Sequence, residues 1–170
     1  MRVYSGKSVF GGIAIGTIQV YKKGEQQVKR RKIEDVPAEI RRYRTAKQTA
    51  LEQLQNLYDK ALKEVGQANA AIFEIHQMML EDDDYNESVE NIIETQRVNA
   101  EYAVAVTEDN FAQMFASMED EYMRGRAADV RDISDRIIAN LTGNVAVQED
   151  SGEKHIICTD DLAPSETVSL

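Results

Sequence analysis

Residues 35–66 read DVPAEIRRYRTAKQTALEQLQNLYDKALKEVG, and this stretch decides the fold because it predicts one long helix. Asp35 is suited to cap its N-terminus, and Pro37 falls in the first turn, where a missing N–H has no cost. Gly66 is a natural C-terminal stop. Spacings of three, four or their sum place the apolar residues on one buried stripe, which consists of Ile40, Tyr43, Ala50, Leu54, Leu57, Ala61 and Val65.

Beyond Gly66 the helical periodicity continues, but an acidic cluster interrupts it. A second helix carries Ile72, Ile75 and Met79. The residues Glu81-Asp82-Asp83-Asp84 follow, and because acidic side chains favour a helix N-terminus, they predict a break and a new start. The third helix runs through Tyr85, Val89, Ile92 and Ile93.

Two more helices complete a helical region that we expect over residues 33–143. Asn99 can cap the fourth helix, which contains Val104, Phe111, Met114 and Phe115. Ser117 with Asp120 resembles a capping box that opens the fifth helix, and Gly143 ends it. One face of the fifth helix carries Tyr122, Arg126, Val130, Ile133, Ile137 and Leu141.

Both ends of the chain have strand character. Residues 1–21 mix β-branched residues with glycines, and we interpret Gly11–Gly16 as a glycine-kinked strand. Near the other end, Val145–Val147 and Ile156–Cys158 flank a turn at residues 150–152. We therefore expect an α+β, multidomain fold, in which an antiparallel helical bundle (33–143) is inserted into a partial α/β domain built from residues 1–21 and 145–170. Because these few strands make a poor independent core, we expect the chain to be part of a longer protein.

Composition excludes several classes of protein. The net charge of -10 argues against nucleic-acid binding, because phosphate contacts need Lys and Arg. No apolar run approaches the ~20 residues of a membrane-spanning helix, and the start lacks the apolar region of a secretory signal. The single cysteine, Cys158, excludes a disulfide framework and is expected to be a small buried residue. These features fit a cytoplasmic bacterial protein that does not bind membranes.

The negative charge is concentrated in the middle helices. Residues 64–123 contain 15 acidic residues and one basic residue, a net charge of -14, whereas the rest of the chain has 15 acidic and 19 basic residues, a net charge of +4. One interpretation is a solvated acidic face, and the other is a docking surface that attracts a basic partner. A cluster of methionines and phenylalanines favours docking, because flexible thioethers suit an adaptable contact surface, although these side chains could also fill a core. They are Met78, Met79, Phe111, Met114, Phe115, Met118 and Met123.

The residues themselves show no convincing active site. His76 could be a phosphorelay site, but it has no obvious local base, so a surface or satisfied core histidine is the plainer interpretation. His155 precedes an apolar strand and is expected to be structural. Gly11–Gly16 lacks the spacing of a dinucleotide loop, and no acidic pair specifies a metal site.

The fifth helix carries opposite charges at pairing distance. Arg131 with Asp135, and Asp132 with Arg136, are four residues apart and can form ion pairs. At least one of Arg126 and Arg131 would then be free to attract phosphate.

Three blocks of this sequence resemble enzyme I, the bacterial phosphoenolpyruvate–protein phosphotransferase family of sugar uptake. They are Gly12–Gly16, Glu121-Tyr122 with Arg126–Ile133, and Asp161–Thr167. The resemblance covers the whole chain, and the Arg126–Ile133 block is highly specific. The sequence departs from the family pattern at Gly11, where a proline is usual, and at Tyr85, where an aliphatic residue is usual.

The resemblance implies a place in a two-step phosphoryl transfer. Enzyme I takes a phosphoryl group from phosphoenolpyruvate onto a histidine and passes it to a histidine of HPr, a small carrier protein. The enzyme histidine belongs to a glycine-rich Ser-His motif that we expect beyond Leu170, so this chain alone is expected to be inactive. The phosphoenolpyruvate and magnesium site and the contacts of the homodimer belong to a carboxy-terminal barrel, so we expect no cofactor or metal here.

The resemblance also implies which residues bind HPr, because the helical insert is the family's HPr-binding domain. Arg126 and Arg131 would lie near the route of the phosphoryl group. By position, the HPr-binding surface consists of Ala71, Glu74, His76, Met78, Met79, Asp82, Asp84, Tyr85, Phe115, Tyr122 and Arg126.

Three other hypotheses stay open on the sequence. The chain could be a stand-alone acidic helical adaptor, a histidine phosphotransfer bundle that uses His76, or an enzyme I-like paralogue from a nitrogen-regulatory or dihydroxyacetone phosphorylation system. The sequence does not specify a sugar.

Overall fold

The structure, a computed structural model, describes residues 11–20, 28–144 and 155–159, together with residues 162, 164 and 167. The chain divides into two units, residues 1–25 with 149–161 and residues 26–148 with 162–170. Five helices lie in sequence between two strands. The elements are β1 (Thr17–Val20), α1 (Val36–Glu64), α2 (Gln67–Glu81), α3 (Asp83–Gln96), α4 (Ala100–Ala116), α5 (Glu121–Thr142) and β2 (His155–Cys158).

The first unit contains a small parallel sheet, in which Thr17 pairs with His155 and Val20 with Cys158. The predicted strand at residues 156–158 is confirmed, whereas the predicted glycine-kinked strand over Gly11–Gly16 is wrong. Those residues have no pairing partner in the described part of the chain, and a strand needs one. Cys158 is exposed, contrary to expectation, because a two-stranded sheet covers little surface. The predicted strand at 145–147 and turn at 150–152 lie outside the described residues.

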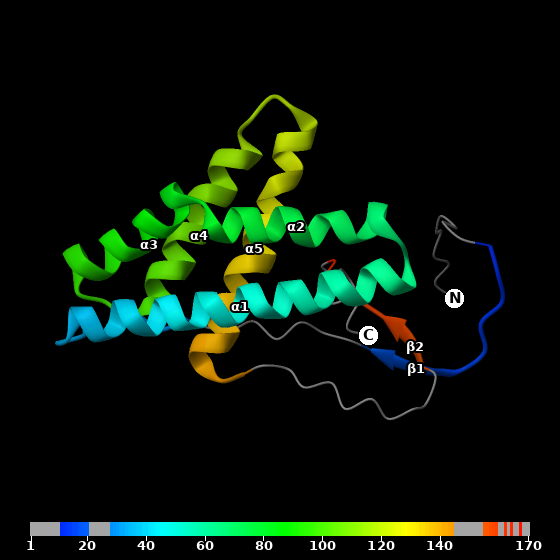
Figure 1. Cartoon of the computed structure of the whole chain (residues 1–170), viewed down its shortest axis with the longest axis horizontal. Coiled ribbons are helices and arrows are strands. Elements are labelled where there is room, and N and C mark those ends of the chain that lie inside the picture. The colour runs from blue at the N-terminus through cyan, green and yellow to red at the C-terminus, as the bar shows by residue number, and fades with distance from the viewer. Residues whose placement is uncertain are drawn as a thin grey trace, which may run out of the picture. The chain divides into compact units, whose positions relative to one another are not determined.

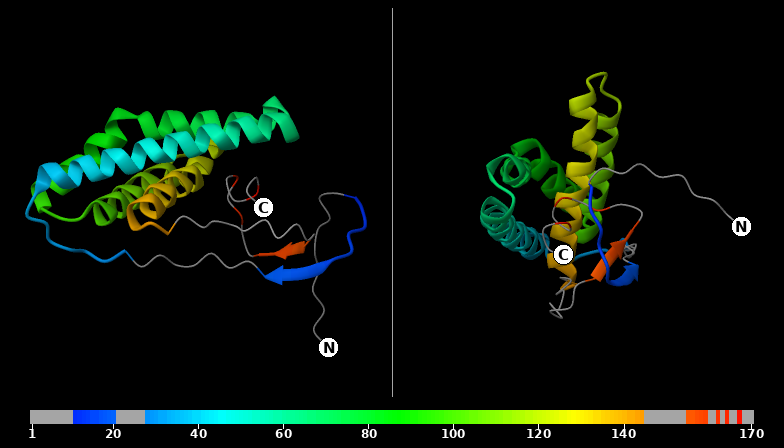
Figure 2. Two further views of the ribbon diagram at one scale, coloured as in Figure 1. Left: turned by 60° about the horizontal axis from the view of Figure 1, so that its bottom comes forward. Right: turned by 90° about the vertical axis from the view of Figure 1, so that its right-hand side faces the viewer.

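The helices of the second unit form two crossed layers. Figure 1 shows α2 and α3 running back along α1 one after the other. In the same view α4 and α5 form a hairpin whose tip projects past α2. The right-hand view of Figure 2 shows this hairpin standing across the layer formed by α1, α2 and α3. The crossing brings the tip of the hairpin toward the junction between α2 and α3.

Local capping explains where these helices begin and end. Asp35 caps α1 by accepting a hydrogen bond from Ala38 N at 2.9 Å, as predicted, and Gly66 follows α1 with a φ of +86°, which suits glycine. The predicted break after α2 is also confirmed. There Asp82 accepts a hydrogen bond from Tyr85 N at 3.1 Å and so caps α3.

The predicted capping box at the start of α5 is wrong. Asp120 is the N-cap, and its side chain accepts a hydrogen bond from Met123 N at 3.0 Å. Ser117 instead ends α4, where its hydroxyl donates to Met114 O at 2.7 Å. A short hydroxyl side chain can serve either helix end, and here the preceding turn lies nearer. Gly143 ends α5 in the left-handed conformation, as predicted.

The core follows the predicted stripe on α1 except at Val65, which lies at the end of the helix and is 53% exposed. It also follows the apolar face of α5 but departs from the prediction on α2. Tyr43, Ala50 and Leu54 of α1 have no exposed area. Val130, Ile133 and Ile137 of α5 are at most 1% exposed. On α2, however, Ile72, Ile75 and Met79 are only half-buried. The fully buried face is instead Ala70, Phe73, His76 and Leu80. Because α2 contacts both α1 and α5, its buried face is rotated toward the space between them.

A polar cluster joins α1 to the start of α4. Glu39 of α1 accepts a hydrogen bond from Ala100 N at 2.7 Å and therefore caps α4 from a neighbouring helix. Arg42 bonds both Glu39 and Glu101, at 2.7 and 2.6 Å. Burial acts to raise the pKa of both carboxyl groups, but the hydrogen bonds and positive charge of Arg42 outweigh it and lower each pKa below its ordinary value of 4.5.

Asn99 extends this cluster to the basic segment before α1. It stands at the predicted N-cap position of α4, but its side chain makes no capping bond. Instead its oxygen accepts from Arg31 N at 2.7 Å and its amide donates to Lys29 O at 3.2 Å. An isolated antiparallel bridge joins Lys32 and Val98. The segment before α1 is therefore anchored to the bundle over residues 29–33.

We predict that Glu101→Gln lowers the free energy of unfolding by about 2 kcal/mol, because it leaves Arg42 without one of its two carboxylates in a largely buried site. Urea denaturation of the full chain measures the loss. Glu90→Gln is the matched control, because it breaks the exposed pair with Arg44 and should cost less than about 1 kcal/mol. Equal losses in the two variants would contradict this account of the cluster.

The same cluster predicts acid sensitivity. A carboxyl group whose pKa is lowered by folding contributes stability above its unfolded pKa, and the contribution disappears as the pH falls through the lower, folded pKa. Glu39 and Glu101 should therefore make the chain lose stability as the pH drops below about 4.5. Thermal melts across this range should show a shallower decline for Glu101→Gln, and an identical decline would count against the prediction.

Candidate partner-docking groove

An open groove of about 480 Å³ lies where four helices meet. The end of α2 and the start of α3 form one side, and the two helices at the tip of the hairpin form the other. Most of the lining is apolar, and charge enters it only through two aspartates and one arginine. The lining residues are Ile75, Met78, Met79, Asp82, Asp84, Tyr85, Phe111, Met114, Phe115, Tyr122, Met123, Arg126, Val130 and Ile133.

Eight of the eleven residues expected to bind a partner line this one groove. They are Met78, Met79, Asp82, Asp84, Tyr85, Phe115, Tyr122 and Arg126. Ala71 and Glu74 do not line it, and they lie about two turns and one turn before Met78 on α2. Ala71 is four residues before Ile75, so it lies on the helix face that continues into the groove. The structure thus brings most of the predicted set together, and their contact with a partner stays a prediction.

The methionines at the groove are partly exposed. Met78 is 71% exposed while the adjacent Met79 is half-buried, so Met78 lies off the core face of α2. Met114 is 45% exposed on the opposite wall. A flexible thioether on each side gives the groove an apolar rim that can adjust to a bound surface.

The break between α2 and α3 sets the acidic wall and the floor of the groove. Asp82 caps α3 and also lines the groove, and Asp84 is exposed in the first turn of α3. Tyr85 follows and is 2% exposed, with its ring edge-on to Phe111 at 5.6 Å. Its hydroxyl lies 2.7 Å from Ser134 Oγ, and burial raises the pKa of Tyr85 well above its ordinary value.

His76 lies behind the groove and is completely buried. Its Nε2 is 3.2 Å from Asp129 Oδ1, and its Nδ1 is 3.5 Å from Asp132 Oδ2. The expectation that His76 belongs to the docking surface is therefore not met, because the side chain has no exposed area. For the same reason a phosphoryl donor has no access to it in this structure, which disfavours the phosphotransfer-bundle hypothesis.

The acidic partners of His76 were not predicted from the sequence. Asp129 lies 53 positions along the chain, so no local pattern connects it to a histidine of α2. The available signal was the spacing of three between Arg126 and Asp129 on α5, which form an ion pair at 2.8 Å. Burial acts to raise the pKa of Asp129, but its bonds to His76 and Arg126 lower it below its ordinary value.

Arg126 stands at the mouth of the groove. Besides Asp129, it donates a hydrogen bond to the Tyr122 hydroxyl, and its guanidinium lies over the Tyr122 ring at 4.3 Å from the centroid. Tyr122 itself is 67% exposed. The three side chains therefore form a small charged and aromatic edge beside the apolar lining.

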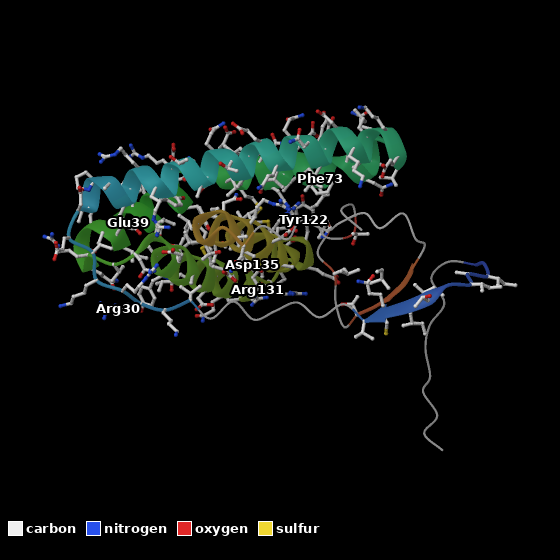
Figure 3. All side chains as sticks on the ribbon, turned by 90° about the horizontal axis from the view of Figure 1, so that it is seen from below. Arg30, Glu39, Phe73, Tyr122, Arg131 and Asp135 are labelled. Atoms are coloured by element: carbon white, nitrogen blue, oxygen red, sulfur yellow. The ribbon has the colours of Figure 1, made fainter. Side chains whose placement is uncertain are left out.

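Arg131 differs from Arg126, since it is exposed and forms no hydrogen bond or ion pair within the described residues. The predicted pair with Asp135 is therefore absent, although both residues lie on α5 in Figure 3. The predicted pairing of Asp132 with Arg136 stays a prediction, and Asp132 faces His76 while Arg136 donates to Gln53 at 3.3 Å.

The described residues contain neither a candidate metal site nor a candidate membrane-spanning helix. They contain no group of three or more His, Cys, Asp or Glu side chains that could hold a metal ion. None of the helices in that part of the chain has the length and apolar character required to cross a bilayer.

The chain matches the model of a known protein family. It belongs to the family described as PEP-utilising enzyme, N-terminal, whose model matches residues 5–126. Among its relatives is the phosphoenolpyruvate-protein phosphotransferase of Bacillus subtilis (strain 168), which is 37% identical over 172 residues. The phosphoenolpyruvate-protein phosphotransferase of Bacillus sp. (strain S) is 36% identical over 167 residues. The chain spans 30% and 29% of the lengths of these two relatives.

Solved structures agree with this assignment. An NMR solution structure of Enzyme I (nEIt) has a TM-score of 0.76 and 37% identity, and the match covers 91% of this chain and 64% of the other. The N-terminal domain of Enzyme 1 - Nitrogen has a TM-score of 0.72 over 94% of this chain and 66% of the other. At 24% identity, that second likeness shows the fold alone.

We predict that the floor of the groove depends on the bond between Tyr85 and Ser134. Ser134→Ala leaves the buried tyrosine hydroxyl without this partner and should lower the free energy of unfolding by about 1–2 kcal/mol. Adding Tyr85→Phe removes the other partner, so the double variant should lose less than the sum of the two single losses. Chemical denaturation of the three variants measures this, and strictly additive losses would contradict a direct bond.

Proposed function

We propose that this chain is the HPr-docking region of a phosphoenolpyruvate–protein phosphotransferase. The observation that carries the proposal is that one groove gathers exposed methionines, aromatic side chains and the aspartates 82 and 84, all within the strongly acidic part of the chain. Such a surface suits a small basic partner that buries an apolar patch. Family membership supports the same reading.

The acidic and the apolar side chains of the groove would contribute to binding in different ways. Asp82 and Asp84 are exposed at the α2–α3 junction and would attract basic side chains during the approach. Met78, Met114 and Phe115 would supply the apolar contact that holds the complex, because burial of apolar area is the main favourable term in association. The rim charges would then govern the rate of association, and the apolar centre would govern dissociation.

In the parent protein we propose that the helices form an HPr-binding domain inserted into a phosphohistidine domain to which β1 and β2 belong. The complete protein would take a phosphoryl group from phosphoenolpyruvate, with magnesium, and pass it through its own histidine to HPr for sugar uptake. It would act in the cytoplasm as a homodimer. The chain described here would supply recognition rather than chemistry.

The two arginines of α5 would then have separate roles. Arg126 lines the groove and could bind an anionic group on the partner, since Asp129 and Tyr122 use only some of its guanidinium N–H groups. Arg131 is exposed, so its charge remains available to a phosphoryl group that passes along α5. We propose that both stabilise the phosphoryl group on its route between the two histidines.

The proposal is tested by titrating the isotope-labelled 170-residue chain with the HPr of the same organism. We expect NMR shift changes in residues 68–85 and 111–126, which include the groove lining. Shift changes confined to the other end of the bundle, around Glu39 and Arg30 in Figure 3, would contradict the proposal.

Charge reversal tests the acidic wall. We predict that Asp84→Lys slows association with HPr several-fold at low salt and weakens its salt dependence, because the side chain is exposed beside the groove. Glu94→Lys is the control, since it makes the same change in net charge on α3 away from the groove. Stopped-flow rates distinguish the two, and equal slowing would mean that only total charge matters.

Truncation of a methionine tests the apolar contact. We predict that Met78→Ala speeds dissociation of HPr and weakens binding by about 1–2 kcal/mol, as is usual for a contact residue at the centre of an interface. Stability should change little because Met78 is 71% exposed. Leu62→Ala removes another exposed apolar side chain, 41% exposed on α1 outside the groove, and should leave dissociation unchanged. Loss of affinity in both variants, or in neither, would argue against the groove.

A further inference from the structure

We infer that His76 is a positioning residue, which holds Asp129 so that Asp129 in turn fixes the Arg126 guanidinium at the mouth of the groove. No exposed part of His76 can meet a partner, so its influence on docking has to pass through other side chains. The inference rests on the proposed function only in that HPr binding is one of its two readouts.

The hydrogen bonds form a continuous series from the core to the surface. His76 of α2 contacts Asp129 of α5 at 3.2 Å, and the other oxygen of Asp129 accepts from Arg126 at 2.8 Å. Arg126 then donates to the hydroxyl of Tyr122, over whose ring it also lies. The series begins at a histidine with no exposure, continues through Asp129 and Arg126, whose side chains are 13% and 12% exposed, and ends at a tyrosine that is 67% exposed.

The chemistry of the first contact fixes its direction. An ionised carboxylate only accepts hydrogen bonds, so the Nε2 that faces Asp129 carries a hydrogen and donates it. The bonds of Asp129 to His76 and Arg126 hold its pKa below the ordinary value, which keeps this carboxyl group ionised at neutral pH. On its other side the ring faces Asp132 at 3.5 Å and contacts the Phe73 ring edge-on, so its orientation is fixed by packing as well.

The consequence for Arg126 follows from the two oxygens of Asp129. An isolated pair three residues apart on a helix surface is weak, because both side chains can rotate away. Here Asp129 cannot turn without breaking its bond to His76, so the oxygen that holds Arg126 stays in place. Asp129 and Tyr122 occupy two of the five N–H groups of Arg126, whose side chain lines the groove and is 12% exposed.

This geometry makes a specific demand on position 76. The residue has to deliver a donor to Asp129 from inside the core, and glutamine can place an amide N–H close to where Nε2 lies. Leucine fills similar space and donates nothing. His76→Gln should therefore preserve the position of Arg126, and His76→Leu should release it.

The test measures HPr affinity of the full chain by calorimetry in two backgrounds. We expect His76→Leu to weaken binding about tenfold, within the range for coupled neighbouring side chains, and His76→Gln to stay within about threefold of the unaltered chain. In the Arg126→Ala background, His76→Leu should have no further effect, because the residue through which it acts is gone. Thr107→Val is the control, since it removes another buried polar contact, with Ser88 at 3.1 Å, away from Arg126.

A second readout does not need HPr at all. The guanidinium NMR signals of Arg126 report its rotation directly, and we expect them to be slow and sharp in the unaltered chain and in His76→Gln, and averaged in His76→Leu. If the unaltered chain fails to bind HPr, the proposed function fails, and these signals still decide the role of His76. Equal weakening by His76→Leu in both backgrounds, or unchanged Arg126 signals, would overturn the inference and leave His76 as a core residue only.

Discussion

The hydrogen bond from Tyr85 N to Asp82 Oδ1, 3.1 Å long, is the constraint on which the groove depends. It ends α2 and begins α3 within two residues, so the chain changes helix without leaving the layer that packs along α1. The same turn exposes Asp84 and places Tyr85 under the hairpin formed by α4 and α5. A continuous helix through this point would rotate these side chains away from one another.

The local features of the helices could be predicted from sequence because each depends on neighbouring residues. Asp35, Gly66 and Gly143 mark helix ends through capping and backbone conformation, and an acidic cluster marks the break before α3. Apart from the capping box at Ser117 and Asp120, which was a local mistake, the departures within the bundle have the opposite origin. The rotated face of α2 depends on where two other helices pack, and the cap that Glu39 supplies to α4 comes from 61 residues away. No periodicity within one helix contains that information.

The candidate site divides in the same way. Its composition was visible as acidic and methionine-rich residues in one segment, and its family as the block from Arg126 to Ile133. The buried pairing of His76 with Asp129 was not visible, because it joins two helices that are distant in sequence. Thus the residues at the surface of the groove were predictable by type, whereas the residues that hold them in position needed the fold.

We propose that HPr lies in the groove between the α2–α3 junction and the tip of the hairpin. An isotope-filtered NMR experiment on the complex of the labelled chain with unlabelled HPr tests this most directly, because it detects only protons of the two proteins that are in contact. The account predicts intermolecular signals from the methyl groups of Met78 and Met114 and from the ring of Phe115. Signals that arise only from residues outside the groove, with these three silent, would contradict it.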